Sequence, residues 1–385
     1  YGEYATCRNL SYEEIEANIK AGKPYVLRLR SQGSPDKEIT FVDAIKGEIK
    51  LPENIHDIVL LKKDGIPTYH FAHAIDDHLM RTTTVVRGGE WLASAPIHYE
   101  LFHLLGFKMP AYAHTAHLMK FDEETGGKRK LSKRKDPELS LDYYRKDGYH
   151  PYTMKVYLLT LLNSNFEEWH EKFPDKDINE FPFSVEKMNQ SGALFDKDKL
   201  HNICKNELSK LSEEELYDFL YDWAKENEPE NVEKWFGDRE KMLQILRLYM
   251  GVGAKRRRKD LMYAKQIFEL ISYFFDGESA EEMDEFKLDE DMVSKILKSY
   301  LAKYDHNDDN SVWFNKLKEI ADEHGFASDM KAYKANPENF KGNVSDIAEA
   351  VRIAVTGRAN TPDLWTIVHI MGEEQMTERI KKHIK

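Results

Sequence analysis

Hydrophobic and polar side chains alternate over several short stretches in the first third of the chain. In residues 24–30, Leu27 and Leu29 alternate with arginines, and this period of two predicts a half-buried strand in which both leucines share one face. Residues 38–51 predict two more strands around a glycine. Residues 57–72 predict a hairpin, because an Asp-Gly turn separates two apolar runs.

Helical signals are interleaved with these strands. Ser11 and Glu14 have the spacing of a capping box, in which each side chain caps the other residue's backbone. After a short helix that carries two aspartates, the β-branched run Thr82–Val86 predicts a strand that ends at Arg87. Ser94 is placed to cap a further helix, with a proline in its first turn. Strands and helices therefore mix here in an α/β manner.

Beyond Asp136 the pattern changes to amphipathic helices. Ser212 and Glu215 form another capping box, and the apolar residues that follow share one face. Near the end of the chain, Thr361 and Pro362 predict the start of a helix with an apolar inner side. The C-terminal two-thirds is therefore predicted to be helical, in two or three bundles.

Length and composition fit a soluble protein with more than one domain. A chain of 385 residues predicts about two to four domains. No apolar run approaches the roughly 20 residues of a membrane helix, so we expect no membrane partner. The two cysteines, Cys7 and Cys204, favour a reducing cytoplasm over a disulfide framework, and they are too few for a four-cysteine zinc site.

One short segment is strongly basic, although the formal net charge of the chain is −12. Residues 128–135 carry six lysines and arginines, and two glycines precede them. Lysine ammonium groups neutralise phosphate oxygens, and a flexible loop can deliver them as a transition state forms. A solvated basic loop without chemistry is the alternative, and for an isolated basic run it is the more common one.

Arg87 stands at the carboxyl end of a predicted parallel strand, where ligands bind in open α/β sheets. Its guanidinium can hold a carboxylate through two hydrogen bonds. Alternatively, it extends into solvent from the strand end without a ligand. Tyr69, just after the predicted hairpin turn, is of a type that more often lies at the edge of a core than against a ligand.

Two further groups of residues have an open interpretation. Seven histidines cluster in sequence: His70, His73, His78, His98, His103, His114 and His117. None has HExxH spacing and no cysteine pair accompanies them, so we predict no metal site. The basic run at residues 254–260 is either a solvated helix start or a contact for RNA phosphates.

Together these segments resemble the class I aminoacyl-tRNA synthetases, specifically the bacterial-type glutamyl-tRNA synthetases. KLSKR at 130–134 is similar to the KMSKS signature of the class, and residues 67–96 resemble the second half-Rossmann segment of the family. The stretches LSLDYYRKDGYHP, SGALFDKDKL and AVRIAVTGRANTPDLWTIVHIMG match its downstream helical segments. The resemblance covers residues 1–385, with the motifs in one order.

The resemblance implies roles for particular residues. Those implied to line the glutamate pocket are Tyr69, His73 and Arg87. Those implied to bind ATP are Glu90, Trp91, Ser132 and Lys133, and the implied catalytic pair is Lys130 and Lys133. Arg87 would hold a carboxylate of the substrate, whereas His73 stands where relatives often have a smaller or amide residue.

The implied reaction is the ATP-dependent attachment of L-glutamate to tRNA through glutamyl-adenylate. ATP with Mg²⁺ is the implied cofactor, and zinc is not expected because Cys7 alone provides no zinc site. The implied partners are L-glutamate and tRNA(Glu), and tRNA(Gln) stays open as a second substrate. A cytoplasmic monomer is expected.

The implied fold is multidomain α/β plus all-α. It combines the second half of a class I Rossmann catalytic domain and an acceptor-stem insertion with helical stem-contact and anticodon-binding domains. The implied domains are the rest of the insertion at 1–68, the Rossmann half at 69–125, the KMSKS-type loop with the stem-contact domain at 126–205, and two helical anticodon-binding domains at 206–300 and 301–385.

Other functions remain open. The HIGH signature of the class is absent and the chain does not begin with Met, so we expect an incomplete, inactive fragment. A non-catalytic tRNA-binding or tRNA-modifying paralogue is one alternative, although such proteins usually lack the helical anticodon half. A glutaminyl-tRNA synthetase is another, although its anticodon region is typically a β-barrel. A metal-dependent hydrolase built on the histidines is more distant.

Overall fold

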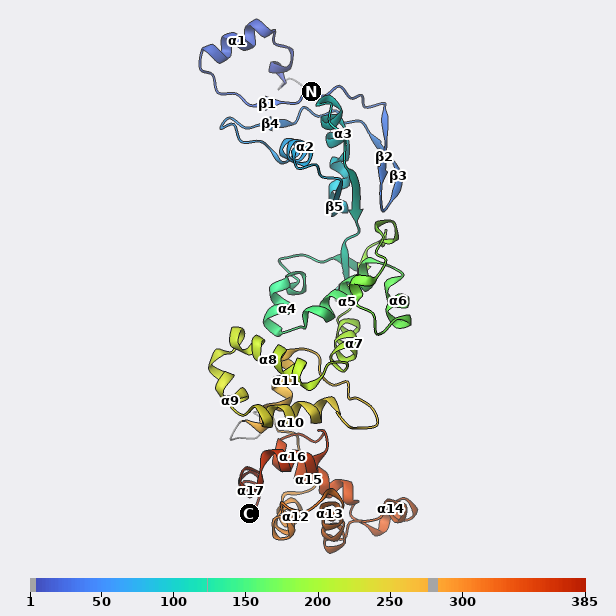
Figure 1. Cartoon of the computed structure of the whole chain (residues 1–385), viewed down its shortest axis with the longest axis vertical. Coiled ribbons are helices and arrows are strands. Elements are labelled where there is room, and N and C mark those ends of the chain that lie inside the picture. The colour runs from blue at the N-terminus through green and yellow to red at the C-terminus, as the bar shows by residue number, and fades with distance from the viewer. Residues whose placement is uncertain (1–4, 123, 276–282) are drawn as a thin grey trace. The chain divides into compact units, whose positions relative to one another are not determined.

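The computed structural model describes residues 5–122, 124–275 and 283–385, which form two compact units (Figure 1). The first unit consists of the residues up to Asp136 and of 156–196, and the second of 137–155 and 197–385. The first unit contains α1 (Tyr12–Lys20), β1 (Leu27–Arg28), β2 (Glu38–Asp43), β3 (Gly47–Pro52), β4 (Val59–Leu61), α2 (Tyr69–Leu79), β5 (Thr84–Gly88), α3 (Ala95–Leu104), β6 (Ala111–Thr115), β7 (Leu118–Phe121), β8 (Lys128–Lys130), α6 (Phe166–Lys172) and β9 (Ala193–Leu194). The second contains α4 (Leu141–Asp147), α7 (Lys197–Leu208), α8 (Glu213–Asn227), α9 (Val232–Phe236), α10 (Arg239–Met250), α11 (Ala264–Ile271), α12 (Glu290–Lys303), α13 (Asn310–His324), α14 (Met330–Ala335), α15 (Val344–Thr356), α16 (Leu364–Met371) and α17 (Glu373–Lys381), while α5 (Pro151–Leu162) contributes residues to both units.

A four-stranded mixed sheet, in the order β3-β2-β6-β5, organises the first unit. The hairpin of β2 and β3 turns at Gly47, whose φ of +75° favours glycine, and it confirms the two strands predicted there. β5 runs parallel to β6 and pairs Arg87 with His114, so Arg87 does lie near the carboxyl end of a parallel strand. β2 joins the sheet through a single parallel pair between Asp43 and Tyr112.

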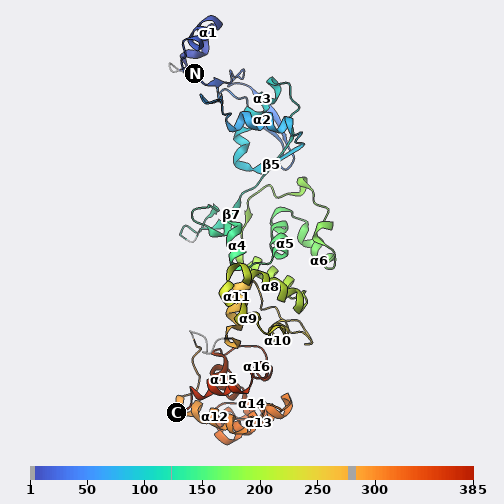
Figure 2. The same cartoon turned by 60° about the vertical axis from the view of Figure 1, so that its left-hand side comes forward.

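Helices α2 and α3 pack against each other beside the strands (Figure 2). Ala74 of α2 and Leu101 and Phe102 of α3 are buried in one cluster with Leu29 and Leu60. Burying these apolar side chains favours the folded state by roughly 25 cal/mol for each Å² removed from water. This packing joins α2 and α3 to each other and to Leu60 of β4.

The prediction that Leu27 and Leu29 share a buried face was wrong. Leu29 is buried, but Leu27 is 47% exposed. The pairing of β1 with β4 shifts register between Leu27 and Arg28, which marks a bulge or irregularity. Such a shift breaks the alternation of side chains, so two residues that are two positions apart no longer face the same way.

The hairpin predicted at residues 57–72 formed only in part. The turn is present, because the Lys62 amide donates to the Ile66 carbonyl at 2.9 Å. The second strand is not, since Pro67 forms only an isolated bridge with Leu61 and α2 begins at Tyr69. The Thr68 amide still donates to the Leu60 carbonyl at 2.8 Å, and the pairing ends after it because the chain turns into α2.

A small second sheet carries the basic segment. β7 pairs with β8 in antiparallel fashion and with β9 in parallel, which gives the order β8-β7-β9. Residues 128–130 are therefore strand rather than loop, and only the later residues of the basic run form a turn. Leu131 is buried, and its amide donates to the Leu118 carbonyl at 3.0 Å.

The second unit is built from helices, as predicted. Buried side chains from Leu208 to Ile380 form one continuous cluster. The capping box of Ser212 and Glu215 is confirmed, but α16 is capped by Asp363, not by Thr361. Among the helices of the described residues, none combines the length and apolarity that crossing a membrane requires.

Gly148 ends α4 in a left-handed conformation with a φ of +78°. A Cβ at this position would lie 2.7 Å from Nε1 of Trp223 and would also overlap the Cβ of Ala264. Gly325 ends α13 in the same way, at a φ of +81°, but a Cβ there would have its nearest neighbour in the Lys341 side chain at 3.7 Å. The two helix ends therefore share the same backbone conformation, but only at Gly325 is there room for a Cβ.

We predict that Gly148→Ala lowers the free energy of unfolding by about 2–5 kcal/mol, because left-handed strain and overpacking add together. The matched control Gly325→Ala retains only the backbone strain and should lose about 1–2 kcal/mol. Urea unfolding of both variants measures the difference. Equal losses would contradict close packing at the end of α4.

Candidate functional site

The candidate site is centred on the guanidinium of Arg87. It stacks on aromatic rings, with its carbon 4.8 Å from the ring centre of Tyr112 and 5.8 Å from that of Trp91. Tyr69, the first residue of α2, packs against Trp91 with ring centres 4.4 Å apart. The predicted residues Tyr69, Arg87 and Trp91 are thus brought together at the end of β5.

Three groups accept hydrogen bonds from Arg87. Its Nε lies 3.0 Å from Nε2 of His114, one terminal nitrogen lies 3.2 Å from Nδ1 of His98, and the other donates to the Trp91 carbonyl at 3.4 Å. His98 in turn lies 2.9 Å from Nδ1 of His70. Because a guanidinium only donates, both ring nitrogens that face it must accept.

The rings around Arg87 are held in the neutral form. Burial lowers the pKa of His98 to about 2, and nearby positive charge acts in the same direction. Burial also lowers the pKa of His70 and of His114, although the hydrogen bond to Asp43 partly offsets it in His114. Neutral rings leave the charge of Arg87 uncompensated by these neighbours, and that charge is then available to an anion.

His73 was predicted to line the glutamate pocket. Its side chain is only 7% exposed, and Nδ1 lies 2.7 Å from Oδ2 of Asp77. The other ring nitrogen, Nε2, lies 2.7 Å from the hydroxyl of Tyr112. His73 therefore has polar neighbours at both nitrogens, and its ring stacks on Tyr69 with centres 5.8 Å apart.

The basic segment is held by Asp136, which is 1% exposed. Arg129 donates to both carboxylate oxygens at 2.7 and 2.8 Å, and the amide of Ser132 donates at 2.7 Å. The bonds from Arg129 keep the pKa of Asp136 well below its usual range. The turn that follows β8 is thus closed on a buried carboxylate, and Lys133 is exposed on it.

Glu90 links the two parts of the site. Its carboxylate lies 3.7 Å from Nζ of Lys130 and 3.4 Å from Nδ1 of His117. Hydrogen bonding to its own backbone N–H, followed by the charge of Lys130, lowers the pKa of Glu90. A pocket of about 540 Å³ opens beside them, lined among others by Gly89 and Lys128.

Sequence reasoning missed Asp43, His98 and His114 as parts of the site. The histidines were considered only as metal ligands, and within the described residues no three His, Cys, Asp or Glu side chains are placed to hold a metal ion. The available signals were the position of His114 near the end of strand β6 and that of His98 on α3, the helix that follows β5. Asp43 likewise stands at the end of a strand, but its pairing with His114 could not be predicted, because the two lie 71 residues apart in the sequence.

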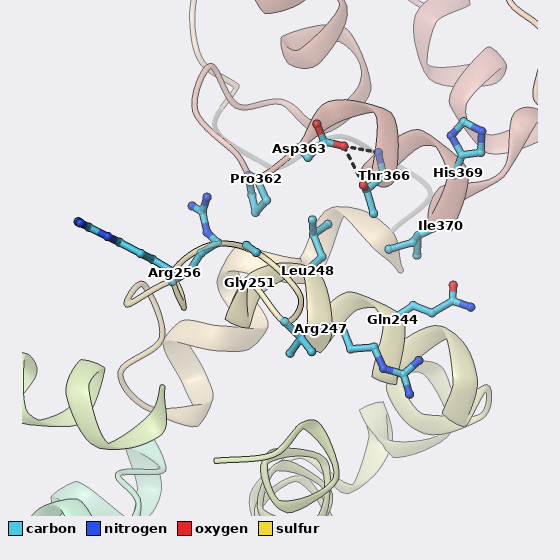
Figure 3. Close-up of a pocket in the computed structure, with 13 residues that line it drawn as sticks. Gln244, Arg247, Leu248, Gly251, Arg256, Pro362, Asp363, Thr366, His369 and Ile370 are labelled. Carbon is cyan, nitrogen blue, oxygen red and sulfur yellow. Dashed lines mark hydrogen bonds between the residues drawn. The ribbon is translucent and has the colours of Figure 1, made fainter. Parts of the chain in front are cut away.

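A second candidate surface lies in the helical unit. A pocket of about 670 Å³ separates α10 and the loop after it from α16 (Figure 3). Arg247 and Arg256 line one side, and Thr366 and His369 line the other. Arg258 is also among the lining residues. The basic run at 254–260 is part of this loop, is mostly exposed and lies ahead of α11 rather than within it.

Two family models match this chain. Residues 3–202 match the family described as tRNA synthetases class I (E and Q), catalytic domain, and residues 230–384 match an anticodon binding domain. The glutamate–tRNA ligase of Acetivibrio thermocellus is 52% identical over 99% of this chain and 69% of its own length, and that of Clostridium perfringens strain SM101 is 46% identical over 100% and 70%.

Solved structures give the same result for the fold. The crystal structure of a glutamate tRNA ligase from Elizabethkingia meningosepticum, in complex with its amino acid, matches with a TM-score of 0.70 at 25% identity, covering 97% of this chain and 71% of that one. The glutamate-tRNA synthetase of Elizabethkingia anophelis matches with a TM-score of 0.69 at 26% identity. The chain therefore belongs to the class I tRNA synthetases, within the glutamate–tRNA ligase family.

Proposed function

We propose that the chain carries the catalytic and tRNA-binding parts of a ligase that attaches L-glutamate to tRNA. The reaction uses ATP, supplied as its Mg²⁺ complex, to form glutamyl-adenylate before transfer to the terminal ribose. The observation that carries the proposal is Arg87, a cation among neutral rings at the carboxyl end of a parallel strand. The similar proteins from Acetivibrio thermocellus and Clostridium perfringens are named glutamate–tRNA ligases, which supports the same reaction for this chain.

The glutamate side of the site consists of Arg87, Tyr69 and His73. Arg87 binds a carboxylate of the substrate, since its planar guanidinium matches two carboxylate oxygens. Tyr69 is 48% exposed and stacks on Trp91, so it offers an aromatic wall beside that cation. His73 bonds to the hydroxyl of Tyr112, whose ring lies against Arg87. This supports a role for His73 in positioning Arg87 more than direct contact with glutamate.

The ATP side consists of Glu90, Trp91 and the basic segment. The pocket of about 540 Å³ beside Gly89 and Lys128 is large enough for a nucleotide base or sugar. Lys130 and Lys133 neutralise the phosphates as pyrophosphate leaves, and Ser132 holds the turn between them. Nζ of Lys130 lies 3.7 Å from the carboxylate of Glu90, which supports a common role for these two residues on the ATP side.

The helical unit binds tRNA in this proposal, and we propose two anticodon-binding domains at 206–300 and 301–385. The arginines at the pocket between α10 and α16 attract phosphates, and the pocket offers apolar surface beside them. tRNA(Glu) is the proposed substrate, and tRNA(Gln) stays open. We propose a cytoplasmic monomer that needs no zinc.

The other functions are less well supported. A tRNA-modifying paralogue would not need the helical unit, which consists of residues 137–155 and 197–385. A glutaminyl enzyme would not be expected to have helices in its anticodon region, where this chain has α10 to α17. The relatives named above are glutamate–tRNA ligases.

For Arg87→Lys we predict a rise in the KM for glutamate of roughly tenfold or more, because the charge remains but the planar fork is lost. The KM for ATP should change little. ATP–pyrophosphate exchange, measured with tRNA present in enzyme that forms glutamyl-adenylate, gives both constants. An equal loss for both substrates would mean that Arg87 supports folding instead.

Lys133→Ala is predicted to lower the rate of adenylate formation by roughly 100-fold, because it removes a charge used mainly in the transition state. The apparent affinity for glutamate should stay the same. Lys135→Ala is the matched control, since Lys135 lies in the same basic run but outside KLSKR. A near-normal exchange rate in Lys133→Ala would overturn the role of this segment.

The chain should bind tRNA(Glu) with an affinity that falls steeply with salt, by about 100-fold between 50 and 200 mM if four phosphates are contacted. Arg256→Gln should reduce the slope of log affinity against log salt by about 1. Lys331→Gln, an exposed cation on α14, is the control and should leave the slope unchanged. Filter-binding titrations over several salt concentrations measure this, and binding that does not respond to salt would contradict the proposed surface.

A further inference from the structure

Asp43 and His114 form a buried pair behind Arg87 that the proposed mechanism does not use. Nδ1 of His114 lies 2.6 Å from Oδ2 of Asp43, and both side chains are completely buried. On the opposite edge of the same ring, Nε2 accepts from Nε of Arg87 at 3.0 Å. The imidazole therefore stands between the carboxylate and the guanidinium.

We propose that Asp43 is a positioning residue for glutamate binding: it holds His114 in the tautomer with the proton on Nδ1, so that Nε2 can accept from Arg87 and fix its guanidinium. This inference rests on the proposed role of Arg87 in binding a substrate carboxylate. Asp43 acts through His114 and takes no part in the chemical step.

Hydrogen-bond directions follow from the donors and acceptors alone. An arginine Nε–H can only donate, so Nε2 of His114 must present its lone pair. A neutral imidazole then carries its proton on Nδ1, and an ionised carboxylate at 2.6 Å is an acceptor for it. The hydrogen bond from Arg87 to Nε2 is therefore possible only with the proton on Nδ1, and the bond from Nδ1 to Asp43 favours that tautomer.

Asp43 is itself fixed in one orientation. Its Oδ1 accepts from the amides of Ile45 and Lys46 at 3.0 and 2.9 Å. Its Oδ2 accepts from the backbone amide of His114 at 3.0 Å in addition to the ring. The side chain cannot turn without losing several buried hydrogen bonds, so it is a rigid support.

Placing a histidine between the two charges has a functional advantage over a direct ion pair. A carboxylate bonded straight to Arg87 would neutralise the guanidinium and occupy donors that the substrate needs. The neutral ring of His114 is oriented by Asp43 and in turn orients the guanidinium of Arg87, whose positive charge stays available to the substrate. His98 contributes a second neutral acceptor, at 3.2 Å from the same guanidinium.

Asp43→Asn tests the inference because the amide must choose an orientation. With its NH₂ group toward Ile45 and Lys46, the amide would face two N–H donors, so the carbonyl is expected there. The NH₂ group then faces the backbone N–H of His114, which loses its acceptor, and Nδ1 of the ring. Nδ1 has to accept, and the ring proton moves to Nε2. That proton would point at Nε–H of Arg87 and displace the guanidinium.

The first measurement uses the 385-residue chain with ¹⁵N-labelled histidine, whose long-range ¹H–¹⁵N spectra distinguish the tautomers. His114 is identified by the signal lost in His114→Gln. We expect the Nδ1–H form in the unaltered chain and the Nε2–H form in Asp43→Asn. An Nε2–H form or an imidazolium in the unaltered chain at neutral pH would overturn the proposal, even if Asp43→Asn fails to fold.

The second measurement is a double-mutant cycle in enzyme that forms glutamyl-adenylate. Asp43→Asn should raise the KM for glutamate by roughly 10- to 100-fold, the effect of disrupting a buried hydrogen bond to a charged group, with little change in the KM for ATP. Glutamine at 114 can accept from Arg87 through its oxygen without a tautomer, so Asp43→Asn should add little in the His114→Gln background.

A matched control separates this effect from general destabilisation. Asp57 also accepts an arginine and a backbone amide, Arg8 at 2.6 Å and Ser31 at 2.9 Å, so Asp57→Asn makes the same change elsewhere in the unit. It should lower stability without a selective rise in the glutamate KM. If Arg87→Lys impairs glutamate binding but Asp43→Asn does not, the positioning role is wrong and the proposed function stands. If Arg87→Lys has no effect on glutamate, the proposed function itself fails.

Discussion

The hydrogen bond between Asp43 and His114 connects the fold of the first unit to its site. β2 meets β6 in a single residue pair, and Asp43 stands at that junction. Its carboxylate accepts from the backbone and ring of His114 and closes the turn into β3 through Ile45 and Lys46. One buried carboxylate thus attaches the hairpin to the parallel strands. An unpaired carboxylate in this position would be strongly unfavourable, so the hairpin and the ring orientation are linked.

The two halves of the site hold their cations in different ways. Arg87 is stacked on Tyr112 and donates to neutral rings whose protonation burial suppresses. Lys133 lies exposed on a turn that is closed by Asp136. A rigid cation suits a carboxylate that must be bound in one orientation. Exposed lysines suit a charge that develops only as pyrophosphate leaves.

Local signals predicted much of the fold. Both capping boxes and the β2–β3 hairpin formed where the sequence indicated, because these features depend on residues close together in the chain. The strand at residues 24–30 did not form as expected, since its register is set by the pairing of β1 with β4. Burial of Leu27 against Leu29 depends on that distant partner, and a periodic pattern carries no information about it.

The same limit applies to the site. Arg87 could be predicted as a site residue because its position at the end of a strand is a local property, and the basic segment because charge is visible in the sequence. Asp43 and Asp136 were not found as supports, although each is buried and holds a cation or its neighbour in place. Aspartates are common on surfaces, and only the folded chain distinguishes the two that are buried.

An acidic chain with a net charge of −12 binds phosphates in this proposal, and the arrangement of its acids explains how. Asp136 is bonded to Arg129, and Glu213 and Glu240 are bonded to Arg247, so these carboxylates orient cations near each proposed phosphate surface. Screening limits the repulsion from acids farther away than about 8–10 Å at physiological salt. Affinity for phosphates then depends on the nearest charges, and the acidic remainder restrains non-specific binding to other polyanions.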